Sequence, residues 1–350
     1  MRRTLVPPFD VPPQPPALGG AVHALHGNTM GTTWSVRLVA HPDRPLAPLQ
    51  QAIQTSLDQV VAQMSTWEPA SDLSRFNAAP AGSWHALPDT FFTVLDHALQ
   101  VAHDSGGAYD PTAGALVDAW GFGPAQRYDE AGFVMPDTSM LATARARCGW
   151  RRLELDRAAQ RARQPGGMKV DLSAIAKGFG VDQVARCLQQ RGIGSFLVEV
   201  GGELRGEGVK PDGQPWWVAL EQPPSGDASC TSAQAGTLAT IAASGTVAAL
   251  YGWSVATSGD YRRCFRADGR RYSHTIDPRS GQPVDNGIAS VTVLHRTCMA
   301  ADAWSTALGV LGAGEGRALA DRLGLCALFV VRDGADLIEM PSAALAALLD

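Results

Sequence analysis

Met168-Lys-Val-Asp-Leu-Ser-Ala-Ile-Ala-Lys-Gly-Phe-Gly-Val-Asp182 is the stretch around which the rest of this sequence can be placed. Its first residues are typical of a strand end, and Ser173 is a candidate N-cap for a helix that follows directly. Apolar residues then recur at helical spacing, at Val181, Val184, Ala185 and Leu188, until Gly192 ends the pattern. The stretch therefore predicts a strand that leads into an amphipathic helix.

The start of this predicted helix has the properties of a phosphate site. Free backbone N–H groups and the helix dipole favour an anion there. Asp171 and Lys177 flank the start, and small residues between them would let a ligand approach closely. An ordinary amphipathic helix with a solvated lysine is the alternative interpretation.

Length and composition narrow the class of protein. The 350 residues are enough for about two average domains or one large mixed domain. A hydrophobic content of 45% and a charged content of 18% are typical of a globular chain, and no window reaches the ~18 apolar residues of a membrane span. The net charge of -5 does not favour nucleic acid as a partner. We expect a small molecule or a protein instead.

The N-terminal segment and the cysteines bear on the location of the protein. Residues 1–26 are rich in proline and contain no apolar core of a secretory signal, so we predict a disordered lead-in and a cytoplasmic protein. A periplasmic, membrane-associated protein is the alternative if the natural start lies upstream. The six cysteines lack C-x-x-C spacing, which favours reduced structural thiols over a disulfide framework or a zinc site.

The remaining elements follow from periodicity and turn residues. Strands are predicted over 33–39, 196–200, 216–220, 289–294 and 327–331, with 216–220 as the hairpin partner of 196–200. Helices are predicted over about 53–64, 92–102 and 317–323, from 299 onward, and in the terminal tail. Residues 222–235 form a predicted surface insertion. Because strands and helices interleave without a regular βαβ rhythm, the fold class is predicted to be mixed α+β.

Two common phosphate-binding motifs are absent. The sequence contains neither G-x-x-x-x-G-K-[ST] nor a strand-coupled G-x-G-x-x-G. A phosphate would have to be held by other means, and the start of the predicted helix together with a hard metal ion is the obvious candidate.

Eight motifs follow one another along the chain: Thr29-Met-Gly-Thr32, residues 64–77, Tyr109-Asp-Pro-Thr112, Asp171-Leu-Ser-Ala-Ile-Ala-Lys-Gly178, Val200-Gly-Gly-Glu-Leu204, Ala256-Thr-Ser-Gly-Asp-Tyr261, Tyr272-Ser-His-Thr-Ile-Asp-Pro278 and Ala301-Asp-Ala-Trp-Ser-Thr306. In this order they resemble the motifs of the ApbE family of FAD:protein FMN transferases. The resemblance covers about residues 27–311. It implies that residues 27–350 form a flavin transferase domain with mixed sheets and packed helices, a T-fold-like architecture.

The resemblance also implies a reaction. Such an enzyme, dependent on Mg²⁺, splits FAD at its pyrophosphate, joins FMN through a phosphoester to a threonine or serine of a target flavoprotein, and releases AMP. Asp302 and Thr306 lie one helical turn apart and offer a carboxylate and a hydroxyl to the metal. By similarity, the carbonyl of Ala174 joins them, with Ser305 beside it. Polar residues at an ordinary helix start are the alternative interpretation.

The same resemblance implies which residues bind FAD. Lys177 would neutralise phosphate charge, and Asp171 would hydrogen-bond the ligand. The other positions matched to FAD-binding residues are Met30, Trp67, Ala108, Tyr109, Asp110 and Ile276. Trp67 stands where the family leads us to expect tyrosine, and either ring can stack on a flavin.

Phosphoryl transfer needs a group that accepts the proton of the acceptor hydroxyl. His274 occupies the histidine position of the family motif, and an ordinary histidine pKa of about 6.5 suits a base near neutral pH. Asp260 is the second candidate. A structural histidine on a strand is the alternative.

Two other functions remain open from sequence. An FAD pyrophosphatase would use the same metal and base but give free FMN and AMP. A non-catalytic FAD-binding protein would not need the metal ligands or the base, whereas Asp302, Thr306 and His274 are all present. Many family members are exported lipoproteins, and this chain shows no lipobox cysteine.

Overall fold

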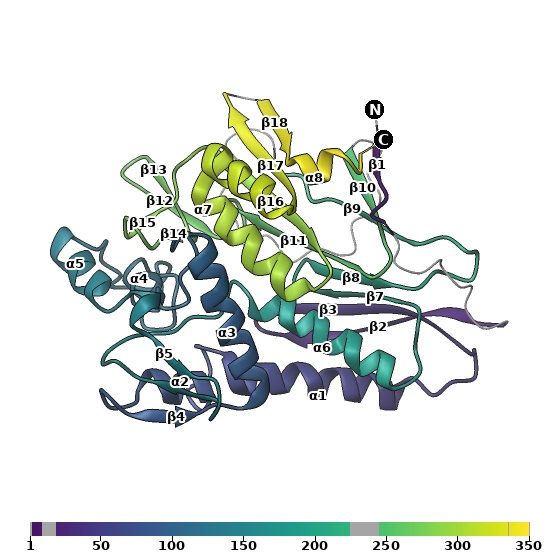
Figure 1. Cartoon of the computed structure of the whole chain (residues 1–350), viewed down its shortest axis with the longest axis horizontal. Helices are drawn as coiled ribbons and strands as arrows, with labels where there is room; N and C mark the ends of the chain where they lie inside the picture. Colours follow the sequence, from purple (N-terminus) through teal and green to yellow (C-terminus); the bar gives the residue numbers. More distant parts are fainter. Residues whose placement is uncertain (1, 9–18, 225–244, 335, 350) are drawn as a thin grey trace.

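An eight-stranded antiparallel sheet forms the centre of the molecule (Figure 1). The computed structural model describes residues 2–8, 19–224, 245–334 and 336–349. The strands of this sheet, from one edge to the other, are β18 (Asp336–Pro341), β17 (Cys326–Asp333), β16 (Ile288–His295), β11 (Trp253–Gly259), β8 (Glu203–Glu207), β7 (Phe196–Val200), β3 (Thr32–Ala40) and β2 (Ala21–Thr29). The predicted mixed α+β class is therefore confirmed.

The central strands carry apolar side chains on both faces of the sheet. All residues of β7 are buried. Phe196 and Val198 belong to one hydrophobic core, whereas Leu197 belongs to another on the opposite face. Because successive side chains of a strand point to opposite faces, the sheet must be covered on both sides.

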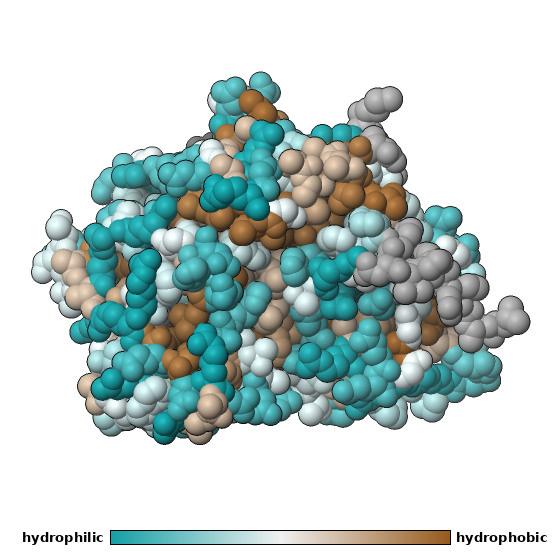
Figure 2. Space-filling view, in the orientation of Figure 1, coloured by the Kyte–Doolittle hydropathy of each residue, from teal (hydrophilic) through white to brown (hydrophobic). Residues whose placement is uncertain are grey.

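Long helices cover one face, and a small sheet covers the other. Helices α6 (Ala176–Gln190) and α7 (Cys298–Leu323) lie across the central strands (Figure 1). Helix α1 (Ala47–Met64) packs against α6 and β2, and α3 (Asp89–Asp104) packs against α7. The small sheet has the order β1 (Arg2–Leu5), β10 (Gly245–Leu250), β9 (Trp216–Ala219). Polar residues cover much of the outer surface in this orientation, whereas apolar residues gather in a band across the upper half of the view and in an area at the lower left (Figure 2).

Shorter elements complete the chain. They are α2 (Asp72–Asn77), β4 (Trp84–Ala86), α4 (Gly114–Ala119), α5 (Thr138–Ala146), the 3-10 helix η1 (Trp150–Arg152), β5 (Glu154–Asp156), β6 (Arg161–Arg163), β12 (Cys264–Ala267), β13 (Arg270–Ser273), β14 (Ile276–Asp277), β15 (Gln282–Pro283) and α8 (Ala343–Ala346). No helix in the described part of the chain is both long and apolar enough to cross a membrane.

The N-terminal segment differs from the sequence prediction. Residues 1–26 were expected to be disordered, but β1 pairs in parallel with β10, and β2 forms an edge of the central sheet. Leu5 is fully buried in the core beneath the small sheet. This pairing joins residues more than 200 positions apart, so a local reading of the proline-rich composition could not find it. Residues 9–18 lie outside the described part.

The partner of β7 also differs from the prediction. Residues 216–220 were expected to pair with 196–200, but β7 pairs with β8, and β9 pairs with β10. Gly201 and Gly202 have φ values of 59° and 100°. Glycine adopts such values without steric cost, so the chain reverses directly after β7.

The segment over residues 168–182 is less regular than predicted. Residues 168–170 form no strand in a sheet, and only Lys169 makes an isolated bridge, with Ala113. Helix α6 begins at Ala176 and not after Ser173. The Asp171 carboxylate accepts the N–H of Ser173 at 2.8 Å. This local turn competes with the helix and delays its start.

The thiol prediction is confirmed for four cysteines and wrong for one. Cys148, Cys187, Cys298 and Cys326 are free thiols. Cys264 is disulfide-bonded. Most of the predicted insertion over 222–235 lies outside the described residues.

The start of α6 packs against the start of α7 at Gly178. An added Cβ at this position would lie 2.7 Å from Asp302 Cβ and would also collide with the carbonyl of Cys298. Gly178→Ala should therefore lower the free energy of unfolding by about 2 kcal/mol, despite the better helix propensity of alanine. Urea unfolding measures the difference.

Gly314→Ala is the matched control for this prediction. Gly314 also lies in a helix, but no atom would be within 4 Å of its added Cβ. Its substitution should leave stability unchanged or raise it by up to about 1 kcal/mol. Equal stabilities of the two variants would show that the helices do not meet closely at Gly178.

Candidate active site

A cleft of about 2240 Å³ opens where the helix starts meet the central sheet. This exceeds the roughly 300–1,000 Å³ of sites for drug-sized ligands, so a dinucleotide fits by volume. Most of the predicted site residues line this cleft: Met30, Trp67, Ala108, Tyr109, Asp110, Asp171, Ala174, Lys177, His274, Ile276, Asp302 and Thr306. The fold thus brings together residues that are distributed over most of the sequence.

Two predicted residues are not among those that line the cleft. The Ser305 hydroxyl is buried and donates to the carbonyl of Asp302 at 2.8 Å, within the helix. The Asp260 carboxylate accepts from Arg271 at 2.7 Å and from Arg332 at 2.9 Å. Each of its two oxygens is thus engaged by a guanidinium group. This arrangement favours His274 over Asp260, and the roles of all these residues remain predictions.

Asp302 and Thr306 lie at the cleft end of α7. Asp302 Oδ2 accepts the backbone N–H of Gly178 at 2.9 Å, which fixes the carboxylate against α6. Together with the carbonyl of Ala174, these residues offer only oxygen ligands, as Mg²⁺ prefers. Among the described residues, no group of three or more His, Cys, Asp or Glu could hold a metal. The donor set therefore suits a hard ion that takes its remaining ligands from a phosphate and water.

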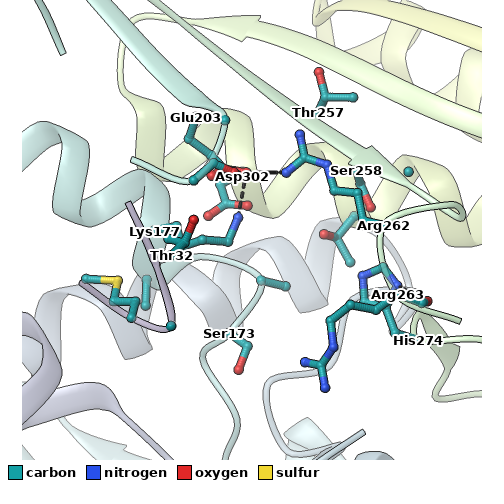
Figure 3. A pocket seen from close by; sticks show the side chains of 18 of the residues that line it. Thr32, Ser173, Lys177, Glu203, Thr257, Ser258, Arg262, Arg263, His274 and Asp302 are labelled. Carbon is teal, nitrogen blue, oxygen red and sulfur yellow. Dashed lines mark hydrogen bonds and ion pairs between the residues drawn. The ribbon is translucent and has the colours of Figure 1, made fainter. Parts of the chain in front are cut away.

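A buried carboxylate lies between two cations in the same cleft. Glu203 is 1% exposed, and its Oε1 lies 2.5 Å from Lys177 Nζ and 3.7 Å from Arg262 Nη1 (Figure 3). Arg262 also contacts Glu221 and donates to the carbonyl of Gly201 at 3.0 Å. Each cation thus approaches the cleft from a fixed direction. Neither Glu203, which belongs to the Val200–Leu204 motif, nor Arg262 was among the predicted site residues.

Burial and the neighbouring charges shift the pKa values of this cluster in opposite directions. Burial raises the pKa of Glu203, although Lys177 opposes the shift. Desolvation acts to lower the pKa of Lys177, but the carboxylates of Glu203 and Asp302 outweigh it, and the pKa is raised. Lys177 therefore stays protonated at neutral pH and can neutralise phosphate charge.

The two remaining carboxylates of the predicted set are engaged by their own loops. Asp110 accepts from the backbone N–H of Thr112 at 2.8 Å and from its hydroxyl at 2.6 Å. Asp171 accepts from Ser173, as described above. Burial raises the pKa of both carboxyl groups. Each has lone pairs left for a ligand, but each also holds a turn in place.

His274 faces the cleft with one nitrogen fixed. Its Nδ1 lies 2.9 Å from the carbonyl oxygen of Arg263, which can only accept a hydrogen bond. Nδ1 therefore carries the proton, and Nε2 keeps a free lone pair. Burial lowers the pKa of His274 to about 4, and the positive charge of Arg263 adds to this effect. The imidazole is thus a neutral proton acceptor at neutral pH.

Trp67 lies at the cleft with its ring open to solvent. The side chain is 47% exposed, unusual for so large an apolar group. A planar ligand in the cleft could cover this ring by stacking.

Lys177→Met should leave Glu203 buried without its nearest cation. We expect a loss of about 3 kcal/mol in the free energy of unfolding, since breaking a buried ion pair strands a charge. The double variant Lys177→Met/Glu203→Met should recover much of this loss, because the Glu203 carboxylate is then no longer buried without its partner. Urea unfolding of both variants is the measurement, and equal losses in the two would contradict the pairing.

Several known proteins are similar to this chain in sequence. The model of the ApbE family matches residues 30–329. The FAD:protein FMN transferase of Vibrio cholerae is 39% identical over 309 residues, 88% of this chain and 87% of that protein. That of Salmonella typhimurium is 34% identical, over 93% of this chain and 89% of that protein.

Solved structures give the same result. The apo form of the flavinyl transferase ApbE from Pseudomonas stutzeri superposes with a TM-score of 0.82 at 39% identity and covers 95% of this chain and 98% of that one. The flavin transferase ApbE from Vibrio cholerae has a TM-score of 0.80 at 36% identity, with 94% and 99% covered.

Proposed function

The chain belongs to the ApbE family, and we propose that it transfers the FMN part of FAD to a threonine or serine hydroxyl of a target flavoprotein. Its membership confirms the family predicted from the eight motifs, and it makes the chain an enzyme of the transferase class. The proposal rests above all on one observation. A neutral histidine with a free Nε2 shares one cleft with Lys177 and with the Asp302–Thr306 pair.

The Asp302–Thr306 pair offers oxygen ligands that suit Mg²⁺. The carboxylate of Asp302, the hydroxyl of Thr306 and the carbonyl of Ala174 are the groups that would hold it. When bound there, Mg²⁺ would neutralise charge on the pyrophosphate of FAD. Lys177 adds a fixed positive charge in the same cleft.

The residues of the cleft support the following transfer step. The acceptor hydroxyl oxygen forms a bond to the phosphorus of the FMN half, while its proton moves to His274 Nε2. The bond between that phosphorus and the bridging oxygen breaks, and the electron pair leaves with AMP. Because Arg263 holds Nδ1, the imidazole keeps Nε2 directed at the cleft throughout.

His274→Ala and Asp302→Ala should each abolish the transfer. Loss of a general base costs typically 10²–10⁴-fold in rate, and loss of the metal carboxylate should cost at least as much. The assay incubates the chain with FAD and an acceptor domain that carries a threonine site, with and without Mg²⁺. AMP release and the intact mass of the acceptor are followed together. His41→Ala and Asp43→Ala, on an exposed loop, are the matched controls.

The outcomes separate the competing functions. Mg²⁺-dependent AMP release with an acceptor that gains the mass of FMN supports the transferase. AMP release with free FMN and an unlabelled acceptor favours the pyrophosphatase. FAD binding without any turnover would contradict both enzymatic functions.

The pH dependence of kcat/KM tests the state of His274. The base works only when neutral, so the rate should fall as pH drops through the pKa of His274 in the free enzyme. Burial and the cations Arg263, Arg262 and Lys177 all lower this pKa, to about 4. The acid limb should therefore lie below about pH 5.5, and not near the ordinary histidine value of about 6.5. A limb at pH 6.5 would contradict the proposed environment of the base.

A further inference from the structure

Arg263 differs from its neighbouring cations in the cleft. Lys177 and Arg262 contact Glu203, and Arg127 contacts Asp129. The Arg263 side chain donates to the carbonyl of Phe122 at 3.3 Å, and no carboxylate of a described residue lies within ion-pair distance of it. Its guanidinium is exposed to the cleft with most of its N–H donors unused.

The position of Arg263 is coupled to that of His274. The main-chain carbonyl of Arg263 accepts hydrogen bonds from Nδ1 and from the backbone N–H of His274, at 2.9 and 3.0 Å. The Phe122 ring packs edge-on against the imidazole, with 6.3 Å between ring centroids. Figure 3 shows the Arg263 and His274 side chains next to each other, across the cleft from Lys177 and Glu203. His274 and Arg263 therefore lie on the same wall of the cleft.

The chemistry at His274 determines what an adjacent cation can contact. At the moment of transfer, the acceptor oxygen is hydrogen-bonded to Nε2 and is bonding to phosphorus. The non-bridging oxygens of that phosphoryl group are one bond further on. The Arg263 guanidinium lines the same cleft as the imidazole, and its planar fork matches phosphate oxygens.

We propose that the Arg263 guanidinium binds the attacked phosphoryl group of FAD and stabilises it from the side of the cleft that carries His274. This inference rests on the proposed transfer reaction. Lys177 and the Asp302 region act from the opposite wall, so the phosphoryl group is held from two sides. Charge is spread over the equatorial oxygens in the transition state, and Arg263 should therefore contribute more to kcat than to FAD binding.

Arg263→Ala and Arg263→Lys test this role, with Arg270→Ala as the matched control. Arg270 lies on the adjacent hairpin, and its exposed side chain pairs with Asp285. We expect kcat to fall about 100-fold in Arg263→Ala, as for the loss of one charge-stabilising donor, with no more than about a tenfold loss of FAD affinity. Arg263→Lys keeps the charge but lacks the fork, so its kcat should be intermediate. Arg270→Ala should match the wild type.

The pH dependence of kcat/KM is a second measurement, which a purely structural role of Arg263 would leave unchanged. Removing a cation next to His274 should shift the acid limb of kcat/KM upward in Arg263→Ala, whereas Arg263→Lys should keep it in place. Thermal melting confirms that the variants are folded. A kcat in Arg263→Ala equal to that of Arg270→Ala overturns the proposal and leaves the transferase function intact.

A failure of the transferase function would look different. If the wild-type chain neither releases AMP nor labels an acceptor, the function is wrong whatever Arg263 does. FAD affinity, measured by titration calorimetry without turnover, then decides the role of Arg263. A loss of about tenfold in Arg263→Ala supports phosphate binding, since a charge-assisted hydrogen bond has been removed. An unchanged affinity overturns it.

Discussion

The close contact between the starts of α6 and α7 is the constraint on which the cleft depends. Gly178 leaves room for the Cys298 carbonyl and the Asp302 side chain, and its N–H fixes one oxygen of the Asp302 carboxylate. A helix start has free N–H groups, and here one of them binds a side chain from another helix. The same contact therefore packs two helices and orients the residue that we propose as the main metal ligand.

The cleft then divides its charges between two walls. On one wall, Glu203 holds Lys177 and Arg262 at a buried position behind the β7–β8 turn. On the other, the main-chain carbonyl of Arg263 holds the imidazole of His274, the base that we propose. A phosphoryl group needs both kinds of environment, since positive charge stabilises it and a neutral acceptor must take the proton. Glu203 begins β8, and the adjacent antiparallel strand β11 ends at Gly259, shortly before Arg262 and Arg263, so the central sheet positions both walls.

Much of the fold follows from local pattern. The apolar spacing of α1 and α3, the alternation in β3 and the Asp268-Gly269 turn between β12 and β13 all appear in the sequence as they do in the structure. Errors arose where pairing is non-local. β1 lies beside β10 across most of the chain, and β9 pairs with β10 and not with β7. The pairing of two distant strands leaves no periodic pattern in the amino-acid sequence of either strand.

For the site, the sequence by itself determined the residue types: an oxygen-ligand pair one helical turn apart, a lysine at a helix start and a histidine before Asp277-Pro278. Only the tertiary structure decided their states. Whether His274 is neutral depends on the Arg263 carbonyl, on burial and on nearby cations, and the raised pKa of Lys177 in α6 depends on Glu203 in β8. Electrostatic environment is a property of neighbours in space, and chain order does not specify those neighbours.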